Sequence, residues 1–381
     1  MISICALKGM NGNMKKAIGI ILNNPTTELG QLTGHRNPIT LPFYARYRLV
    51  DFAMSNMVNS SIRKIALIAS DKYRSLLDHV GSGQEWGLSR KSKSLIILQG
   101  ANRLRRSMKV SVNMMDFSKN RTVFERNYTD QVLIVCPNTI CQINYKDAIE
   151  YHIKNDNDVT FISTLSNENV NPDNDVFISC NEDMLVNHIS FGKKLGCKYQ
   201  YSGMLIVSRA TILSFIDFSE DSGEIDMLEI IDENLDSLRV GNVVFDGYLK
   251  RINTINQYFK TSMELLNPEV SSNLFKSEAK VYTKEKDNHP TRYMHNADVT
   301  ASCIASGSKI DGTIRKSVLF RQVNVGTNSS ITNCVIMEGC KIGENVVLDY
   351  VISDRNVIIN DGITLRGTED NPIILSKEME I

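Results

Sequence analysis

The chain has 381 residues, of which 42% are hydrophobic and 23% are charged, and its 43 basic residues balance its 43 acidic ones. This composition is typical of a globular protein with two or three domains, and the zero net charge argues against nucleic acid or an anionic membrane as a partner. No window approaches about 18 consecutive apolar residues, so the sequence predicts no membrane-spanning helix.

The first 13 residues, MISICALKGMNGN, contain too few basic and apolar residues for a secretion signal. Because Met14 and the KKAIGIIL that follows it look like a natural beginning, we interpret residues 1–13 as a disordered extension or a start-site artefact. The eight cysteines contain no CxxC pair, which favours reduced thiols in the cytoplasm over a disulfide framework or a zinc site.

Short apolar runs alternate with amphipathic stretches between residues 14 and 266, which we expect to form one domain. Such an alternation predicts an α/β fold with a Rossmann-like, mostly parallel sheet that is covered on both faces. A closing helix is predicted at residues 253–266, and helical stretches occur at 73–80 and 145–155. The predicted strands lie at residues 17–22, 64–70, 131–136, 158–164, 201–208 and within 240–252.

Residues 267–297 are polar and predict a linker, after which the sequence pattern changes. In the segments KSVLF, NCVIM and DYVIS, the aligned residues Val318, Val335 and Val351 lie 17 and 16 residues apart. Apolar residues at six-residue intervals, in coils of about 18 residues, are typical of a left-handed parallel β-helix built from hexapeptide repeats. We therefore expect this β-helix over residues 298–381, with an irregular β-sandwich as the alternative.

Two segments resemble a known family. RYRLVDFAMSNMVNSSIRKIALIAS at Arg46–Ser70 and GYLKRINTINQYFKTSMELL at Gly247–Leu266 look like segments of bacterial ADP-glucose pyrophosphorylases, also called glucose-1-phosphate adenylyltransferases. The resemblance covers nearly the whole chain from residue 14 and implies a nucleotidyltransferase sheet followed by a β-helix. It is strongest to the second subunit that accompanies the catalytic subunit in certain bacteria.

The family's reaction joins ATP and glucose 1-phosphate into ADP-glucose and pyrophosphate, using a phosphate-binding loop of sequence GGxGTRLxxLT. This chain has NNPTTELGQLT, so Asn23, Asn24 and Thr26 replace the three glycines and Glu28 replaces the arginine. Side chains and a proline then stand where bare backbone would face the triphosphate, and the Glu28 carboxylate would repel pyrophosphate by several kcal/mol. Pro38 replaces the lysine of the family's R-A-K-P motif.

The resemblance also implies that the Mg²⁺ site is lost and that the chain has no cofactor. Asn138 stands in place of the aspartate of the family's G-D-H step, and Arg251 stands in place of the aspartate of Y-W-R-D-V-G-T. Mg²⁺ is usually held by carboxylates, and a guanidinium would exclude it, although the same charge could attract a phosphate-bearing ligand. The sugar-phosphate motif Glu-Lys-Pro does not occur. Ser202 matches a serine of the substrate pocket, with a strand hydroxyl as the alternative reading.

The family binds sugar-phosphate activators and nucleotide inhibitors through basic side chains, and three arginines here are candidates for an effector. Arg36 and Arg48 match effector-contacting arginines, and Arg46 completes an R-x-R step that could grip a phosphate. Surface or interface ion pairs are an equally good explanation, and the family's neighbouring lysine and histidine are replaced by His35 and Pro42. The other retained residues are interpreted as scaffold: Asp51, Phe52, Ser55, Asn56, Asn59 and Ser60.

These losses predict a catalytically inactive, modulatory subunit that forms a hetero-tetramer with the catalytic subunit in the cytoplasm. An active nucleotidyltransferase with an unusual site is the main alternative, and a small-molecule sensor that acts alone is another. A hexapeptide acyltransferase is disfavoured, because such enzymes generally use a histidine of the β-helix as base, and all six histidines precede Asp298.

Overall fold

The computed structural model describes residues 17–23, 29–69, 72–88, 94–101, 112–126, 129–166, 175–222, 225–275 and 278–381. The chain divides into two compact units that are discontinuous in sequence. The first unit contains residues up to 26 and residues 52–251, and the second contains residues 27–51 and 252–381. The extension predicted at residues 1–13 lies outside the described residues.

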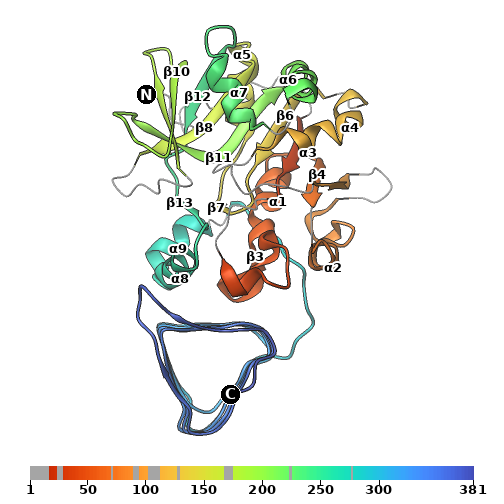
Figure 1. The fold of residues 1–381 in the computed structure, drawn as a ribbon. Helices are drawn as coiled ribbons and strands as arrows, with labels where there is room; N and C mark the ends of the chain where they lie inside the picture. The colour runs from red at the N-terminus through yellow and green to blue at the C-terminus, as the bar shows by residue number, and fades with distance from the viewer. Residues whose placement is uncertain are drawn as a thin grey trace. The chain divides into compact units, whose positions relative to one another are not determined.

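A nine-stranded sheet forms the centre of the first unit (Figure 1). Its strands run in the order β10-β9-β11-β6-β1-β4-β5, and β8 pairs with both β11 and β12. β1 is parallel to β4 and β6, and β5 is parallel to β4, whereas β11 is antiparallel to β6 and β8. The strands are β1 Ala17–Ile21, β4 Lys64–Ala69, β5 Leu95–Gln99, β6 Gln131–Val135, β8 Val159–Leu165, β9 Val176–Cys180, β10 Val186–Phe191, β11 Tyr199–Ser208 and β12 Val240–Val244.

Helices pack on this sheet because its strands are apolar on both sides, as β1 shows by burying all five of its residues. A Cβ atom on Gly19 would lie 2.4 Å from the Met57 sulfur, so glycine here leaves room for the Met57 side chain of α1 in its observed position. The mostly parallel, helix-covered sheet predicted from the sequence is confirmed. The helices are α1 Leu49–Asn59, α2 Arg74–Val80, α3 Met114–Ser118, α4 Arg121–Glu125, α5 Lys146–Lys154, α6 Arg209–Ser222 and α7 Met227–Glu233.

The second unit begins with residues 27–51 and continues with α8 Ile255–Glu264 and α9 Pro268–Leu274. A capping box in which Thr254 and Gln257 exchange hydrogen bonds starts α8, the helix predicted at 253–266. α9 lies within the segment predicted as a linker, where the Asn267 side chain accepts a hydrogen bond from the Glu269 amide. Before α1 the chain forms short 3-10 turns and a small hairpin, β2 Pro42–Phe43 with β3 Tyr47–Arg48.

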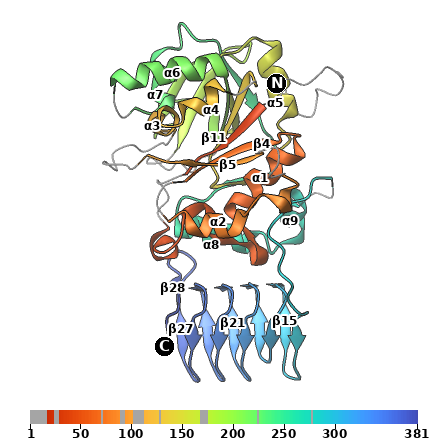
Figure 2. The same cartoon turned by 90° about the vertical axis from the view of Figure 1, so that its right-hand side faces the viewer.

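A left-handed parallel β-helix completes the second unit and confirms the fold predicted for the C-terminal part. Figure 2 shows its coils stacked one on another, in three sheets of five strands each. The strands are β14 Arg292–Tyr293, β15 Asp298–Thr300, β16 Cys303–Ile304, β17 Lys309–Ile310, β18 Thr313–Arg315, β19 Val318–Leu319, β20 Asn324–Val325, β21 Ser330–Thr332, β22 Val335–Ile336, β23 Lys341–Ile342, β24 Val347–Asp349, β25 Val351–Ser353, β26 Ile358–Ile359, β27 Thr364–Arg366 and β28 Ile373–Leu375.

The strand pairing between coils differs in one detail from the alignment of Val318, Val335 and Val351 in the sequence. Val318 pairs with Val335, as expected, but Val335 pairs with Ile352 rather than with Val351. Both steps are therefore 17 residues long, and the 16-residue step expected from the valines is wrong. Val351 instead packs in the apolar interior of the β-helix. Because valine and isoleucine are both aliphatic, residue type does not show whether Val351 or Ile352 aligns with Val335. A pattern based on residue type alone therefore misplaced the strand by one residue.

Candidate functional site

The loop that follows β1 is described only in part. Asn23 is buried at the end of the strand, while Asn24, Thr26 and Glu28 lie outside the described residues. Pro38 occupies the first turn of a short 3-10 helix at Pro38–Thr40, which the Asn37 side chain caps by accepting a hydrogen bond from the Ile39 amide. Proline suits this position, because its missing N–H would have no partner in the helix.

The structure brings Asn138 and Arg251 next to each other in the first unit. The short strands β7 Thr139–Cys141 and β13 Leu249–Arg251 pair antiparallel, with Arg251 opposite Thr139, the residue after Asn138. Asn138 is buried. Burial raises the pKa of the Cys136 thiol to about 11, and the nearby Arg251 guanidinium opposes this rise. The two positions singled out in the sequence thus meet at the end of β6.

Arg251 forms an ion pair with Asp175, and its Nη1 atom lies 3.9 Å from Oδ1 of that carboxylate. Both side chains are largely buried, with 13% and 8% of their surfaces exposed. A buried amide and a guanidinium already paired with a carboxylate do not fit a divalent cation, because the guanidinium repels it and the amide supplies no charge. Among the described residues, no group of three histidine, cysteine or acidic side chains could hold a metal ion.

Ser202 lies in β11 at an irregularity between Tyr201 and Met204, in the pairing with β8. Its hydroxyl is buried and donates a hydrogen bond of 2.5 Å to the carbonyl of Ile162. Gly203 adopts a φ of +87° there, which favours glycine at this position of the irregular strand. The Ser202 hydroxyl thus forms its hydrogen bond within the sheet.

Asn56 in α1 and Ser60, which directly follows the helix, form hydrogen bonds within the first unit. The Asn56 side chain donates to the carbonyl of Cys141 and accepts from the Ile143 amide. The Ser60 hydroxyl accepts a hydrogen bond from the Tyr145 amide. These bonds satisfy buried backbone groups of the chain that follows β6.

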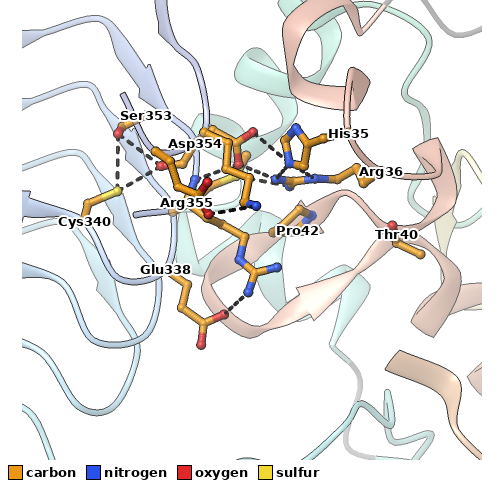
Figure 3. A network of polar contacts seen from close by, with 12 residues as sticks. His35, Arg36, Thr40, Pro42, Glu338, Cys340, Ser353, Asp354 and Arg355 are labelled. Atoms are coloured by element: carbon orange, nitrogen blue, oxygen red, sulfur yellow. Dashed lines mark hydrogen bonds and ion pairs between the residues drawn. The ribbon is translucent and has the colours of Figure 1, made fainter. Parts of the chain in front are cut away.

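The second unit holds a network of charged residues that includes Arg36 (Figure 3). Arg36 is 4% exposed, and its guanidinium donates a short hydrogen bond to Asp354, which is completely buried. The Arg36 Nε also donates to Nε2 of His35, at 3.1 Å. Burial and the neighbouring Arg36 charge lower the pKa of His35, so this histidine stays neutral and can accept the bond. Arg36 is therefore engaged by groups of its own unit.

Arg46 and Arg48, the other two candidates, also belong to the second unit. The guanidinium of Arg46 lies over the ring of Tyr47, 4.9 Å from its centre, and donates to the Tyr47 hydroxyl. Burial, followed by the positive charge of Arg355, lowers the pKa of Arg48 to about 10, while Asp51 opposes the shift. Arg48 thus lies near two cations, Arg36, which the sequence singled out, and Arg355, which it did not.

Residues of the β-helix that lie near these arginines were not predicted from the sequence. Figure 3 shows Glu338, Asp354 and Arg355 on neighbouring coils. A Glu338 oxygen lies 3.6 Å from Nη2 of Arg355, and Glu338 also pairs closely with Lys286. The available signal was weak, because a hexapeptide pattern separates apolar from polar positions but does not show which polar residues meet another segment.

A nucleotidyltransferase sheet followed by a hexapeptide β-helix defines the class of protein. Residues 19–173 match the family model described as nucleotidyl transferase, and residues 278–371 match the GlmU-like C-terminal hexapeptide model. The chain is 30% identical to the glycogen biosynthesis protein GlgD of Bacillus subtilis (strain 168) over 92% of each chain. The chain belongs to the GlgD family of glycogen biosynthesis proteins.

Two further relatives agree with this assignment. The glycogen biosynthesis protein GlgD of Geobacillus stearothermophilus is 32% identical over 95% of this chain and 96% of its own length. The glucose-1-phosphate adenylyltransferase of Bacillus thuringiensis (strain Al Hakam) is 26% identical over 92% of this chain and 95% of its own length. In the part of the chain that the structure describes, no helix has both the length and the apolar character needed to span a membrane.

Proposed function

We propose that the chain is a modulatory subunit of glucose-1-phosphate adenylyltransferase in cytoplasmic glycogen synthesis and that it is itself inactive or nearly so. The observation that carries the proposal is Arg251 beside Asn138, at the positions where the family's resemblance places two metal-binding aspartates. Transfer of a nucleotidyl group depends on neutralising the charge of the leaving pyrophosphate. A guanidinium paired with Asp175 does not supply a divalent cation for that purpose.

A subunit without catalytic groups can still change the activity of a partner. If it binds the active conformation of the catalytic subunit more tightly than the inactive one, assembly shifts the population towards the active form. The retained fold supports this role, since the nine-stranded sheet and the β-helix are both present although the loop sequence differs. We place the effector response of the complex partly in this chain, at the region of Arg36, Arg46 and Arg48.

The test compares the catalytic subunit alone with an equimolar mixture of the two chains, at equal concentration of the catalytic subunit. We expect the mixture to form a hetero-tetramer and to change substrate or effector affinity by about fivefold or more. ADP-glucose formation and analytical ultracentrifugation provide the measurements. The proposal fails if rate, effector response and oligomer size are all unchanged. Turnover by this chain alone, with any nucleoside triphosphate and sugar phosphate, would favour the active-enzyme alternative.

Restoring the loop alone is not expected to restore catalysis. The variant carries Asn23→Gly, Asn24→Gly, Thr26→Gly and Glu28→Arg, which recreates the glycines and arginine of the family's loop. Asn138 and Arg251 still deny the metal its ligands, so ADP-glucose formation should stay at the background of the unmodified chain. Substantial synthesis by this fourfold variant would show that our interpretation of the metal site is wrong. A matched variant that also carries Asn138→Asp and Arg251→Asp tests whether the loop and the metal site must both be restored before ADP-glucose forms.

A further inference from the structure

Two cysteines of the first unit lie opposite each other on neighbouring segments of the sheet. β9 and β11 pair antiparallel, and the outermost pair of their ladder is Tyr199 opposite Ile178. Continuing this register by two residues on each side places Cys197, just before β11, opposite Cys180, the last residue of β9. Side chains alternate along a strand, and Cys180 packs against the same apolar cluster that contains Ile178 and Tyr199. The register therefore directs both cysteines to one face of the sheet.

The chain just before β11 keeps the extended course that this register requires. The Ser166 amide donates to the Lys198 carbonyl at 3.0 Å, which continues the pairing of β8 with β11 by one residue. The Ser166 hydroxyl donates to the Cys197 carbonyl at 3.2 Å. Opposed residues of an antiparallel pair have Cα atoms about 4.5 to 5.5 Å apart, and a disulfide spans Cα separations of about 4.4 to 6.8 Å. A disulfide can therefore join two residues placed in this way.

Both residues are free thiols in the part of the chain that the structure describes. Burial raises the pKa of the Cys180 thiol to about 12, the neighbouring Cys197 adds to this rise, and the Asn242 side chain opposes it. The influence of Cys197 on Cys180 agrees with the closeness that the register implies. Because a protonated thiol is a weak nucleophile, we expect the pair to react slowly and to stay reduced until it meets an oxidant.

A cavity gives small molecules a route to one of the two thiols. Its volume is about 720 Å³, and its lining comes from the turn between β9 and β10 and from the start of β11, including Cys180, Met184 and Lys198. Cys180 is half-buried, whereas Cys197 is only 1% exposed. An oxidant in this cavity therefore meets Cys180 first, and Cys197 can react only with a sulfur that Cys180 presents to it.

We propose that Cys180 and Cys197 form a reversible redox site, in which a small-molecule disulfide such as glutathione disulfide converts the two thiols into an intramolecular disulfide. The Cys180 thiolate attacks one sulfur of the oxidant, whose S–S bond breaks and releases the first small thiol. The Cys197 thiolate then attacks the Cys180 sulfur of this mixed disulfide, which forms the bond within the protein and releases the second small thiol. The two cysteine protons end on the two released thiols, so the protein loses two electrons and the oxidant gains them.

The position of this pair in the first unit indicates what the bond would hold. A bond between residues 180 and 197 closes a loop that contains all of β10. It also fixes the end of β9, the strand that begins directly after Asp175, the partner of Arg251. In a protein that works in the cytoplasm, a disulfide is typically transient and redox-sensing, so this site suits regulation better than permanent cross-linking. The inference does not depend on the function proposed above.

The first test uses the full, unmodified chain, so it does not depend on a variant that folds. The protein is treated with glutathione disulfide, its remaining thiols are blocked with N-ethylmaleimide, and it is digested with trypsin without reduction. Cleavage after Lys194 and Lys198 leaves Cys197 on the peptide LGCK, separate from the peptide that carries Cys180. We expect mass spectrometry to find these two peptides linked and dithiothreitol to separate them. The inference is overturned if neither cysteine reacts, if Cys180 keeps a glutathione adduct without the link, or if either cysteine links preferentially to another one.

Three variants test the order of the two steps. Cys197→Ser removes the second attack, so the glutathione adduct on Cys180 should accumulate to a level about tenfold or more above that of the unmodified protein. Cys180→Ser should give neither the link nor an adduct on the buried Cys197. Cys303→Ser is the matched control, because Cys303 is also half-buried but lies in the β-helix, and it should leave the yield of the link unchanged. An adduct on Cys197 in the Cys180→Ser protein, or no accumulation in Cys197→Ser, would contradict the proposed sequence of attacks.

Discussion

Arg36→Ala is expected to lower the free energy of unfolding by about 3 to 5 kcal/mol, because the buried Asp354 carboxylate loses its charged partner. Arg36 and Asp354 are 4% and 0% exposed, and the arginine also donates to His35. Removing one member of a buried pair leaves an uncompensated charge where water cannot solvate it. Urea denaturation followed by circular dichroism measures the effect, and the double variant Arg36→Ala/Asp354→Ala should lose less than the sum of its single changes.

Arg315→Ala provides the matched control for this prediction. Arg315 pairs with Asp298 on the same β-helix at 3.2 Å, but the two side chains are 60% and 56% exposed. An exposed pair contributes at most about 1 kcal/mol. Equal losses from Arg36→Ala and Arg315→Ala would contradict this expectation, which rests on the burial of the first pair and the exposure of the second.

The second large effect is expected from Gly326→Ala, which should destabilise the β-helix by about 3 kcal/mol. A Cβ atom at this position would lie 2.4 Å from the carbonyl oxygen of Gly343, on the next coil. That oxygen is a backbone atom that accepts a hydrogen bond from the Ser329 hydroxyl, and the Gly343 amide donates to Ile359 on the following coil, so the oxygen cannot move aside as a flexible side chain could. Thermal unfolding monitored by circular dichroism should show the loss.

Gly34→Ala tests whether the effect is steric rather than a general cost of replacing glycine. Gly34 has helical dihedral angles, and the nearest atom to its added Cβ lies 3.5 Å away. Alanine there should change the stability by less than about 1 kcal/mol. A Gly326→Ala protein as stable as the Gly34→Ala protein would mean that neighbouring coils can separate more easily than the structure implies.

The sequence predicts most of the elements whose apolar pattern is strong, although the apolar strand β5, LIILQ, was not among the expected strands. β1, β4, β6 and β8 agree with the expected strands to within one or two residues, and the recurrence of valines indicates the β-helix. β9 and β10 were not predicted, because their partly polar sequences VFISC and VNHISF do not stand out from the surrounding loops. α9 was missed for a similar reason, since its sequence PEVSSNL has little apolar periodicity.

Only part of the candidate site, likewise, could be predicted from the sequence. The proximity of Asn138 and Arg251 was implied by the resemblance, and the β7–β13 pairing provides it. The network around Asp354 and Glu338 could not be predicted, because its members come from segments far apart in the chain. Arg36 and Asp354 are separated by 318 residues, and no local pattern predicts which polar residue meets which.

The discontinuity of the second unit has a consequence for the order of events during synthesis. Residues 27–51 leave the ribosome well before the rest of their unit, which begins at residue 252. At about 5 to 20 residues per second, Arg36 waits roughly 15 to 60 s before Asp354 is made. During that interval the carboxylate that pairs with Arg36 has not yet been made, so this unit can fold only after its β-helix has been synthesised.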